Sequence, residues 1–199
     1  MNSTVTKREI DLDLLKQGNR GELAALVEQF SNPVYRIAMN ILHSEQDAED
    51  IIQETFIKVF HGIRNFEGRS SLATWIYRIA VNEALMATRR RKGNLVSIDA
   101  EIDMGEGETN PVEIEDWCCR PEVETMDAEL RREMDKAVAG LPEKLRIVFQ
   151  LRDMEDLSIR ETAQVLGLTD SAVKTRLLRA RLILREELTH YFQGTSQGQ

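Results

Sequence analysis

The 199-residue sequence predicts an all-α protein with two small helical domains joined by a flexible acidic linker. Aromatic residues make up only 6% of the chain and charged residues 30%, which favours helices over a sheet. No segment alternates apolar and polar residues strongly enough to predict a strand. Helical periodicity fails over one stretch rich in glycine, proline and acids. We therefore expect domains at residues 10–92 and 126–192, with the linker at 93–125.

The first domain is expected to hold a series of helices. Residues 22–30 and 33–42 have the pattern of two consecutive helices. Ser44 is placed to cap a longer one, along which a wide apolar stripe and a polar stripe share the helical period. A polar loop with one aromatic residue follows over 65–71. The last helix, over 72–91, ends in a run of four cations at 89–92.

The second domain is expected to begin with helices over 127–139 and 142–152, with Pro142 in a first turn, where proline is tolerated. Ser158 and Glu161 form a capping box that can start the next helix. Gly167 can take the left-handed conformation that ends it, and Thr169 or Asp170 can cap the helix that follows. The residues expected to face inward on that last helix are Val173, Leu177, Ala180 and Leu184. This is the layout of a helix-turn-helix, whose second helix enters the DNA major groove.

The outer face of this second helix is strongly basic. Five cations and no acid occur from Lys174 to Arg185. An ordinary helical hairpin with a solvated cationic face is the alternative, but such a dense run favours nucleic-acid binding. The outward positions are Lys174, Thr175, Leu178 and Arg179, with Arg176, Arg181 and Arg185 on the flanks.

The net charge of −8 is concentrated in the linker. Ten acids and a single arginine lie between Asp99 and Glu124, so the rest of the chain is close to neutral. A nearly neutral domain gains little from counterion release, and its own affinity for DNA should be weak. We therefore expect a larger partner to hold the protein on DNA.

Several classes of function lack support in the sequence. No apolar run approaches the roughly 20 residues that cross a bilayer, and no signal peptide is apparent, so we expect a cytoplasmic protein. The adjacent Cys118 and Cys119 suit free thiols better than a redox pair, although a redox pair stays open. We expect no metal site, no cofactor and no enzymatic activity, because ligand spacing, a nucleophile elbow and a phosphate loop are all missing.

Two stretches of the first domain are candidates for binding. Residues 47–60 place acids and Gln53 in the first turns of a helix, which is typical either of a solvated face that suits the helix dipole or of a docking surface for a basic partner. Residues 66–84 combine aromatics, hydroxyls, arginines and an asparagine, the groups that bind unstacked bases. Within this second stretch Trp75 and Ile79 are better explained as core residues. The stronger candidates are Arg69, Ser70, Ser71, Arg78 and Asn82.

Four features occur together in one order: the acidic amphipathic stretch, the stretch from Thr74 to Asn82, the acidic linker, and Leu141-Pro142-Glu143 before the helix-turn-helix. In this the chain resembles the extracytoplasmic-function (group 4) sigma factors of bacterial RNA polymerase, in the sigma-70 family, from about residue 10 to 190. The resemblance implies that residues 10–92 are sigma domain 2 and residues 126–192 sigma domain 4. It further implies an alternative sigma factor that binds core RNA polymerase, reads the minus-35 and minus-10 promoter elements and aids promoter melting.

The resemblance also assigns roles to residues. Those matching the family's docking positions for core polymerase are Asp47, Asp50, Gln53 and Glu54. Those assigned to minus-10 DNA are Phe66, Arg69, Ser70, Ser71, Arg78, Asn82, Arg89, Arg90 and Arg91. Those assigned to minus-35 DNA are Ser171, Lys174, Thr175, Arg176, Leu178 and Arg179. Many relatives carry arginine where Lys174 stands, and lysine lacks the bidentate fork that arginine offers to guanine.

By the same resemblance, the acidic linker replaces a missing sigma domain 3 and threads through the polymerase. A cognate anti-sigma factor is expected to wedge between the two domains; a small-molecule substrate is not expected. Two other hypotheses remain. A stand-alone helix-turn-helix regulator would bind DNA as a dimer without polymerase, and an enzyme with a DNA-binding tail would need catalytic groups in the first domain.

Overall fold

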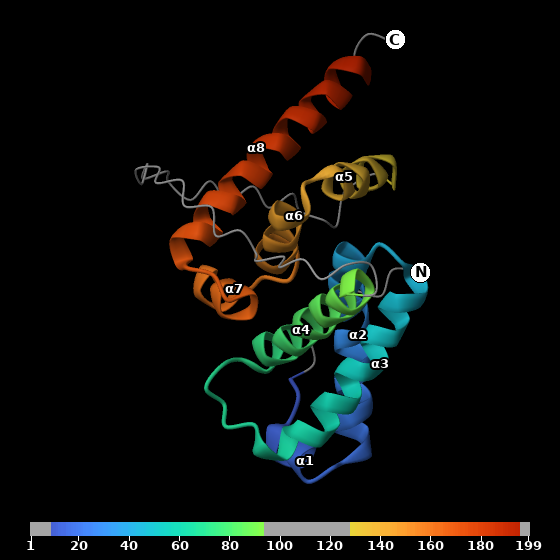
Figure 1. The fold of residues 1–199 in the computed structure, drawn as a ribbon, viewed down its shortest axis with the longest axis vertical. Helices are drawn as coiled ribbons and strands as arrows, with labels where there is room; N and C mark the ends of the chain where they lie inside the picture. The colour runs from blue at the N-terminus through green and yellow to red at the C-terminus, as the bar shows by residue number, and fades with distance from the viewer. Residues whose placement is uncertain (1–8, 94–127, 196–199) are drawn as a thin grey trace.

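The computed structural model describes residues 9–93 and 128–195, and over these ranges it is helical with no strand, which confirms the predicted fold class (Figure 1). The N-terminal half contains α1 (Leu12–Lys16), α2 (Arg20–Leu42), α3 (Glu45–Gly62), the short η1 (Ile63–Asn65) and α4 (Leu72–Gly93). The C-terminal half contains α5 (Ala128–Gly140), α6 (Glu143–Phe149), the π-helical turn η3 (Gln150–Met154), α7 (Ile159–Leu166) and α8 (Asp170–Thr195). Almost all of the predicted linker, with Cys118 and Cys119, lies outside the described residues.

The prediction of two helices over 22–42 is wrong, because α2 runs through Pro33 without a break. Proline removes one helical hydrogen bond and costs about 3 kcal/mol in a helix interior. The apolar stripe on both sides of Pro33 offsets this cost, since Leu26, Val34 and Ile37 are completely buried against α3 and α4. Tertiary packing therefore overrides the local break signal.

The start and the inner face of α3 agree with the sequence. The Ser44 side chain accepts a hydrogen bond from the amide of Asp47, as expected of a cap. Most of the predicted stripe is buried, including Ala48 and Val59 at 0% exposure. Phe60 is an exception: its side chain is 39% exposed and contacts Phe56, with ring centroids 6.2 Å apart. The stripe is one residue narrower than its periodicity suggests.

The helix-turn-helix forms as predicted. Ser158 and Glu161 complete the capping box, and Gly167 ends α7 with a φ of 65°. Thr169, rather than Asp170, supplies the side-chain cap of α8, accepting from the amide of Ala172 at 3.2 Å. The four residues predicted to face inward on α8 are all buried, with exposures of 0 to 5%: Val173, Leu177, Ala180 and Leu184.

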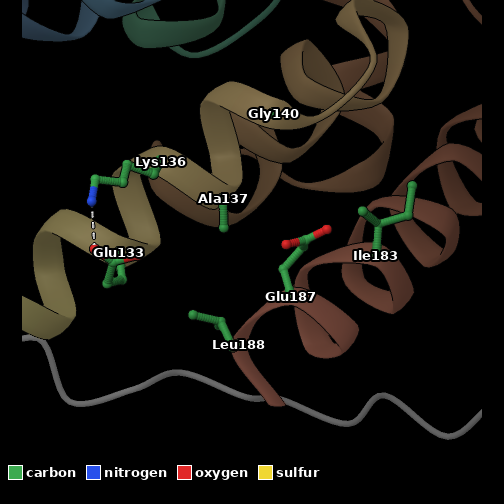
Figure 2. Close-up of a pocket in the computed structure, with 7 residues that line it drawn as sticks. All are labelled: Glu133, Lys136, Ala137, Gly140, Ile183, Glu187 and Leu188. Carbon is green, nitrogen blue, oxygen red and sulfur yellow. Dashed lines mark hydrogen bonds and ion pairs between the residues drawn. The ribbon is translucent and has the colours of Figure 1, made fainter. Parts of the chain in front are cut away.

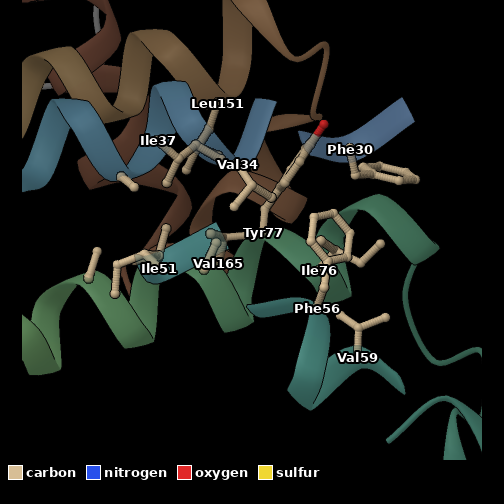
Figure 3. Packing of buried hydrophobic residues seen from close by; sticks show 14 of the residues in the cluster. Phe30, Val34, Ile37, Ile51, Phe56, Val59, Ile76, Tyr77, Leu151 and Val165 are labelled. Carbon is tan, nitrogen blue, oxygen red and sulfur yellow. The ribbon is translucent and has the colours of Figure 1, made fainter. Parts of the chain in front are cut away.

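The two halves of the chain pack directly against each other. In Figure 1, α7 lies beside α4, and α6 contacts α2. The hydrophobic core of the N-terminal half takes in side chains from the C-terminal half, among them Leu151, Leu157 and Val165. Figure 3 shows Leu151 and Val165 among residues of α2, α3 and α4. The C-terminal half also keeps a core of its own around Val148 and Val173.

Candidate functional site

The basic face of α8 is available on the surface. Ser171, Lys174 and Arg179 are exposed, and Leu178 is 37% exposed between them. Thr175 and Arg176 are half-buried at the edge of this face. All six predicted minus-35 residues therefore belong to one helix, in the geometry of a recognition helix whose first turns reach base edges.

Arg181 differs from the other cations of α8. Its Nε and Nη2 donate to the two carboxylate oxygens of Asp153, at 2.9 and 2.8 Å. This bidentate geometry ties the guanidinium to η3, within the same domain. Arg181 therefore acts as a structural brace, although the sequence places it on the flank of the basic face.

The acidic face of α3 is also on the surface. Asp50 is exposed, Gln53 and Glu54 are exposed about one turn later, and Asp47 is half-buried. The exposed Ile57 and Phe60 continue this face toward the end of the helix, at 49% and 39% exposure. An acidic surface with an apolar margin is suited to docking on a basic protein partner.

Asp47 and Arg91 form an ion pair with each other. The sequence assigned these residues to different partners, Asp47 to polymerase and Arg91 to DNA. In the described chain they link the start of α3 to the end of α4. Arg89 and Arg90 are exposed beside them, so the basic end of α4 keeps two cations facing solvent.

The loop after η1 is anchored by its aromatic residue. Phe66 is only 7% exposed and its ring packs on Trp75, with centroids 5.1 Å apart. Gly62 allows this arrangement, because a Cβ there would lie 3.0 Å from Trp75 Cζ2. The indole is half-buried, in agreement with its expected role in the core. Phe66 thus holds the loop in place, and its buried ring is not available for stacking on a base.

The other predicted minus-10 residues lie at or near the surface. The Arg69 side chain is 85% exposed and forms an ion pair with Glu67, two residues before it. Ser70 donates to the carbonyl of Ser71 at 3.3 Å. Arg78 and Asn82 are exposed, one helical turn apart on α4. They form a polar ridge that leads from the loop toward the basic end of the helix.

Sequence reasoning missed a contact between α7 and the start of α4. Glu161 Oε1 accepts hydrogen bonds from the hydroxyls of Ser71 and Thr74, both at 2.9 Å. Its Oε2 accepts from the backbone amide and the hydroxyl of Ser158, at 3.0 and 2.8 Å. Burial alone raises the pKa of the Glu161 carboxyl, but these hydrogen bonds outweigh it and hold the pKa below its ordinary value.

A second missed contact centres on Glu155, which is 8% exposed. Its Oε1 accepts from Arg36 Nη2 and from Gln150 Nε2, both at 2.7 Å. Its Oε2 accepts from the Tyr77 hydroxyl at 3.2 Å. Burial, together with this nearby carboxylate, raises the pKa of Tyr77, so its hydroxyl stays protonated as a donor.

The same network continues along the interface between α2 and α6. Asn40 donates to Gln150 Oε1 at 3.2 Å, and Gln150 is only 1% exposed. Arg146 Nη2 lies 3.0 Å from both the Asn40 carbonyl and His43 Nε2. Burial lowers the pKa of Arg146, while nearby Glu143 opposes this effect. In the sequence, the one signal for this network is Gln150, a polar residue within an apolar run.

A hollow of about 230 Å³ lies between α5 and α8, away from these contacts (Figure 2). Its lining combines apolar side chains with Glu187 and a Glu133–Lys136 pair at 2.6 Å. It contains none of the predicted site residues. Over residues 9–93 and 128–195, the His, Cys, Asp and Glu side chains form no cluster that could hold a metal ion. Within the same ranges, no helix is both long and apolar enough to cross a membrane.

Two family models match the chain. Sigma-70 region 2 matches residues 26–93, and Sigma-70 region 4 matches residues 131–184. The chain is 32% identical over 174 residues to the ECF RNA polymerase sigma factor SigW of Bacillus subtilis, covering 87% of this chain and 92% of that protein. It is also 32% identical over 183 residues to the ECF RNA polymerase sigma-E factor of Haemophilus influenzae, covering 89% and 93%.

Solved structures share the fold. The sigma factor RpoE of Bartonella quintana, in complex with the anti-sigma factor NepR, aligns with a TM-score of 0.59 at 23% identity, covering 87% of this chain and 98% of that one. CnrH, in complex with the cytosolic domain of CnrY, aligns with a TM-score of 0.58 at 23% identity, covering 90% and 95%.

Proposed function

Because the chain belongs to the extracytoplasmic-function sigma factors of the sigma-70 family, we propose a role in promoter recognition for three of its surfaces. As an alternative sigma factor, the protein directs transcription initiation with RNA polymerase and binds promoter DNA. Such factors act without covalent chemistry. The finer assignment to group 4 rests on the run from an acidic linker directly into the helix-turn-helix domain, with no intervening domain.

We assign polymerase docking to the acidic face of α3. Asp50, Gln53 and Glu54 project from one side of the helix and are free to meet a basic surface. Asp47 would contribute at the edge, since it is half-buried and paired with Arg91. Ile57 and Phe60 beside this face supply apolar area that becomes desolvated on binding, as such interfaces use.

The observation that carries the proposal is the solvent-facing basic side of α8 in a capped helix-turn-helix. Lys174 and Arg179 can reach base edges or phosphates of the minus-35 element, and Arg176 suits a phosphate. Because Arg181 is held by Asp153, we do not include it among the residues proposed to contact DNA. Lysine at position 174 acts as a point charge rather than a fork, so its preference for guanine should be weaker than that of arginine.

We assign minus-10 recognition to the loop before α4 and the ridge on that helix. Ser70, Ser71 and the exposed Arg69 would hold an unstacked base and its phosphate, and Arg78 and Asn82 would follow the strand. Arg89 and Arg90 would contact the backbone beyond. Trapping one base outside the stack costs a few kcal/mol, which contacts in the pocket offset, so strand capture aids melting.

A cognate anti-sigma factor and a cytoplasmic location are further parts of the proposal, because the family acts on polymerase there. The structural neighbours that share the fold are described in complexes, RpoE with the anti-sigma factor NepR and CnrH with the cytosolic domain of CnrY. In this chain α7 packs directly on α4. An inhibitor that wedges between the domains must therefore first displace that contact.

The experiment that tests the function is transcription in vitro with purified core RNA polymerase on a library of genomic promoters. We expect a discrete set of transcripts that depends on both the protein and the polymerase. The free protein should bind the same promoters weakly at physiological salt. Tight, specific binding of duplex DNA without polymerase would instead support the stand-alone regulator.

A further inference from the structure

One of the five cations on the basic face of α8 is paired with an acid of the same domain. Arg181 lies seven residues after Lys174, which is about two helical turns and ~10 Å along the axis. Its Nε and Nη2 donate to the two carboxylate oxygens of Asp153, at 2.9 and 2.8 Å. A carboxylate of η3 therefore supplies the counter-charge for a cation that stands beside the proposed minus-35 residues.

The position of Arg181 is suited to a contact with the DNA backbone. The first turns of a recognition helix contact base edges in the major groove, which is about 12 Å wide. A residue ~10 Å farther along the helix than Lys174 lies near the edge of that groove, where the phosphates are. Arginine binds phosphate in the same bidentate way as it binds a carboxylate. Asp153 and a DNA phosphate would therefore compete for the same guanidinium.

The packing of the domain holds this pair in place. The side chains of Asp153 and Arg181 are 19% and 35% exposed. Asp153 belongs to η3, in which Leu151 is completely buried, and η3 continues α6, which packs on α8. The carboxylate is thus fixed relative to the helix that carries Arg181. A bidentate contact of Arg181 with a phosphate requires that the guanidinium first leave Asp153.

This exchange of one anion for another brings little gain in DNA affinity. Protein cations bind phosphates strongly because they displace counterions condensed on the DNA. A neutral pair of Arg181 and Asp153 displaces none. Opening the pair would leave the half-buried Asp153 carboxylate without its counter-charge and close to a phosphate of the same sign. Arg181 therefore adds no net affinity for the DNA backbone as long as Asp153 is ionised.

From this geometry we propose that Asp153 limits the affinity of α8 for the DNA backbone by holding Arg181 away from phosphates. The proposal rests on the function proposed above. Bulk DNA offers a large excess of non-specific sites, and a weaker backbone contact leaves more of the protein available to polymerase. The cations of the basic face that lie outside this pair are Lys174, Arg176, Arg179 and Arg185.

The test is a salt titration of the full chain with a labelled DNA duplex of random sequence, followed by fluorescence anisotropy. Asp153→Ala should raise the affinity about fivefold at 0.15 M salt and steepen the slope of log affinity against log salt by about 0.9, because Arg181 then gains one phosphate contact. Asp153→Asn keeps the size of the side chain and removes its charge, so it should shift both quantities in the same direction. A role in folding alone would not raise DNA affinity.

Three further variants assign the effect to Arg181. The double variant Asp153→Ala with Arg181→Ala should return the slope to the wild-type value, because the added cation is gone. Arg181→Ala alone should leave the slope unchanged, since the paired arginine contributes no phosphate contact. The matched control is Glu186→Ala, which removes an exposed acid of α8 outside this pair and should also leave the slope unchanged.

The minus-35 preference gives a second readout, from transcription by the reconstituted holoenzyme. The template pair is a promoter with its minus-35 element intact and the same promoter with that element scrambled. Asp153→Ala and Asp153→Asn should keep the wild-type preference within about twofold, because a phosphate contact carries no sequence information. A preference lost in both variants would show that Asp153 orients the reading residues instead, and would overturn the proposal.

An unchanged affinity and slope in both Asp153 variants would overturn the proposal, as would an equal gain in the double variant or in Glu186→Ala. A shallower slope for Arg181→Ala would do the same, because Arg181 would then bind DNA despite Asp153. Loss of the helical circular dichroism signal in both Asp153 variants would reduce the pair to a folding element, which also contradicts the proposal. Failure of the proposed function is distinguishable: no promoter is then transcribed, whereas the titration uses neither promoter nor polymerase.

Discussion

The acidic face of α3 and the start of α4 lie in the same domain but differ in access. On α3, Asp50 and Glu54 point into solvent. At the start of α4, Ser71 and Thr74 already bind a carboxylate from the other domain. One surface is ready for a partner and the other is occupied. Under the proposed roles, we expect docking on polymerase to precede capture of the promoter strand.

The strongest way to break this comparison is to reverse the charge of the open surface. Asp50→Lys with Glu54→Lys should lower affinity for core polymerase by about 1,000-fold, if each residue contributes about 2 kcal/mol to the interface. Binding of labelled core enzyme measures the change. The control is Glu45→Lys with Glu49→Lys, exposed acids of the same helix outside the proposed set. An equal loss of polymerase affinity in the control would show that the effect depends only on the net charge of the helix.

The next largest effect is expected on α8. Lys174→Ala with Arg179→Ala should reduce minus-35-dependent transcription by about 100-fold, because each lost base or phosphate contact costs about 1–3 kcal/mol. Polymerase affinity should change little. Arg132→Ala with Lys136→Ala removes the same charge from α5 and serves as the control. Unimpaired transcription by the α8 variant would show that another surface reads the element.

The linker should produce a smaller, more selective effect. Deletion of residues 99–115 should reduce initiation about tenfold with little loss of polymerase affinity, because its acids would mimic nucleic acid in a basic channel. Replacing these residues with a glycine-serine segment of equal length removes the charge of the linker and keeps its reach, so the two contributions can be measured separately. If this replacement restores full initiation, only length matters. Equal losses of initiation and binding would count against a threaded linker.

The smallest expected effect sharpens the comparison at the occupied surface. Burial raises the pKa of the Glu161 carboxyl, but hydrogen bonds from Ser158, Thr74 and Ser71 outweigh this effect and lower the pKa. The stability that the ionised Glu161 carboxylate gives to the contact between the two halves is therefore fully present above the ordinary pKa of 4.5. It is lost as the pH falls through the lowered pKa. Acidification below about pH 4.5 should weaken the contact between the two halves of the chain, changing its equilibrium constant by a factor under about three. Scattering against pH measures it, and Glu161→Gln, which keeps the capping box, should lack this component.

The sequence predicted the elements better than it predicted their partners. The capping box, the left-handed Gly167 and the buried side of α8 each follow from local rules and were confirmed. The predicted helix break at Pro33 was wrong, because the packing of α2 outweighs the local cost of proline. The roles of the proposed site residues stay predictions. Periodicity indicates which side of a helix is buried, but not what covers it, so the second role of Glu161 was out of reach.

The π-helical turn at the end of α6 has a consequence for how such proteins can diverge. The amide of Glu155 bonds to the carbonyl of Gln150, five residues earlier, so the turn is one residue wider than an α-helical turn. Removal of one residue would restore ordinary winding and swing the next side chains by about 100° around the axis. A single codon gained or lost there would uncouple the contacts between the two halves of the chain, while the proposed DNA-binding side chains stayed unchanged.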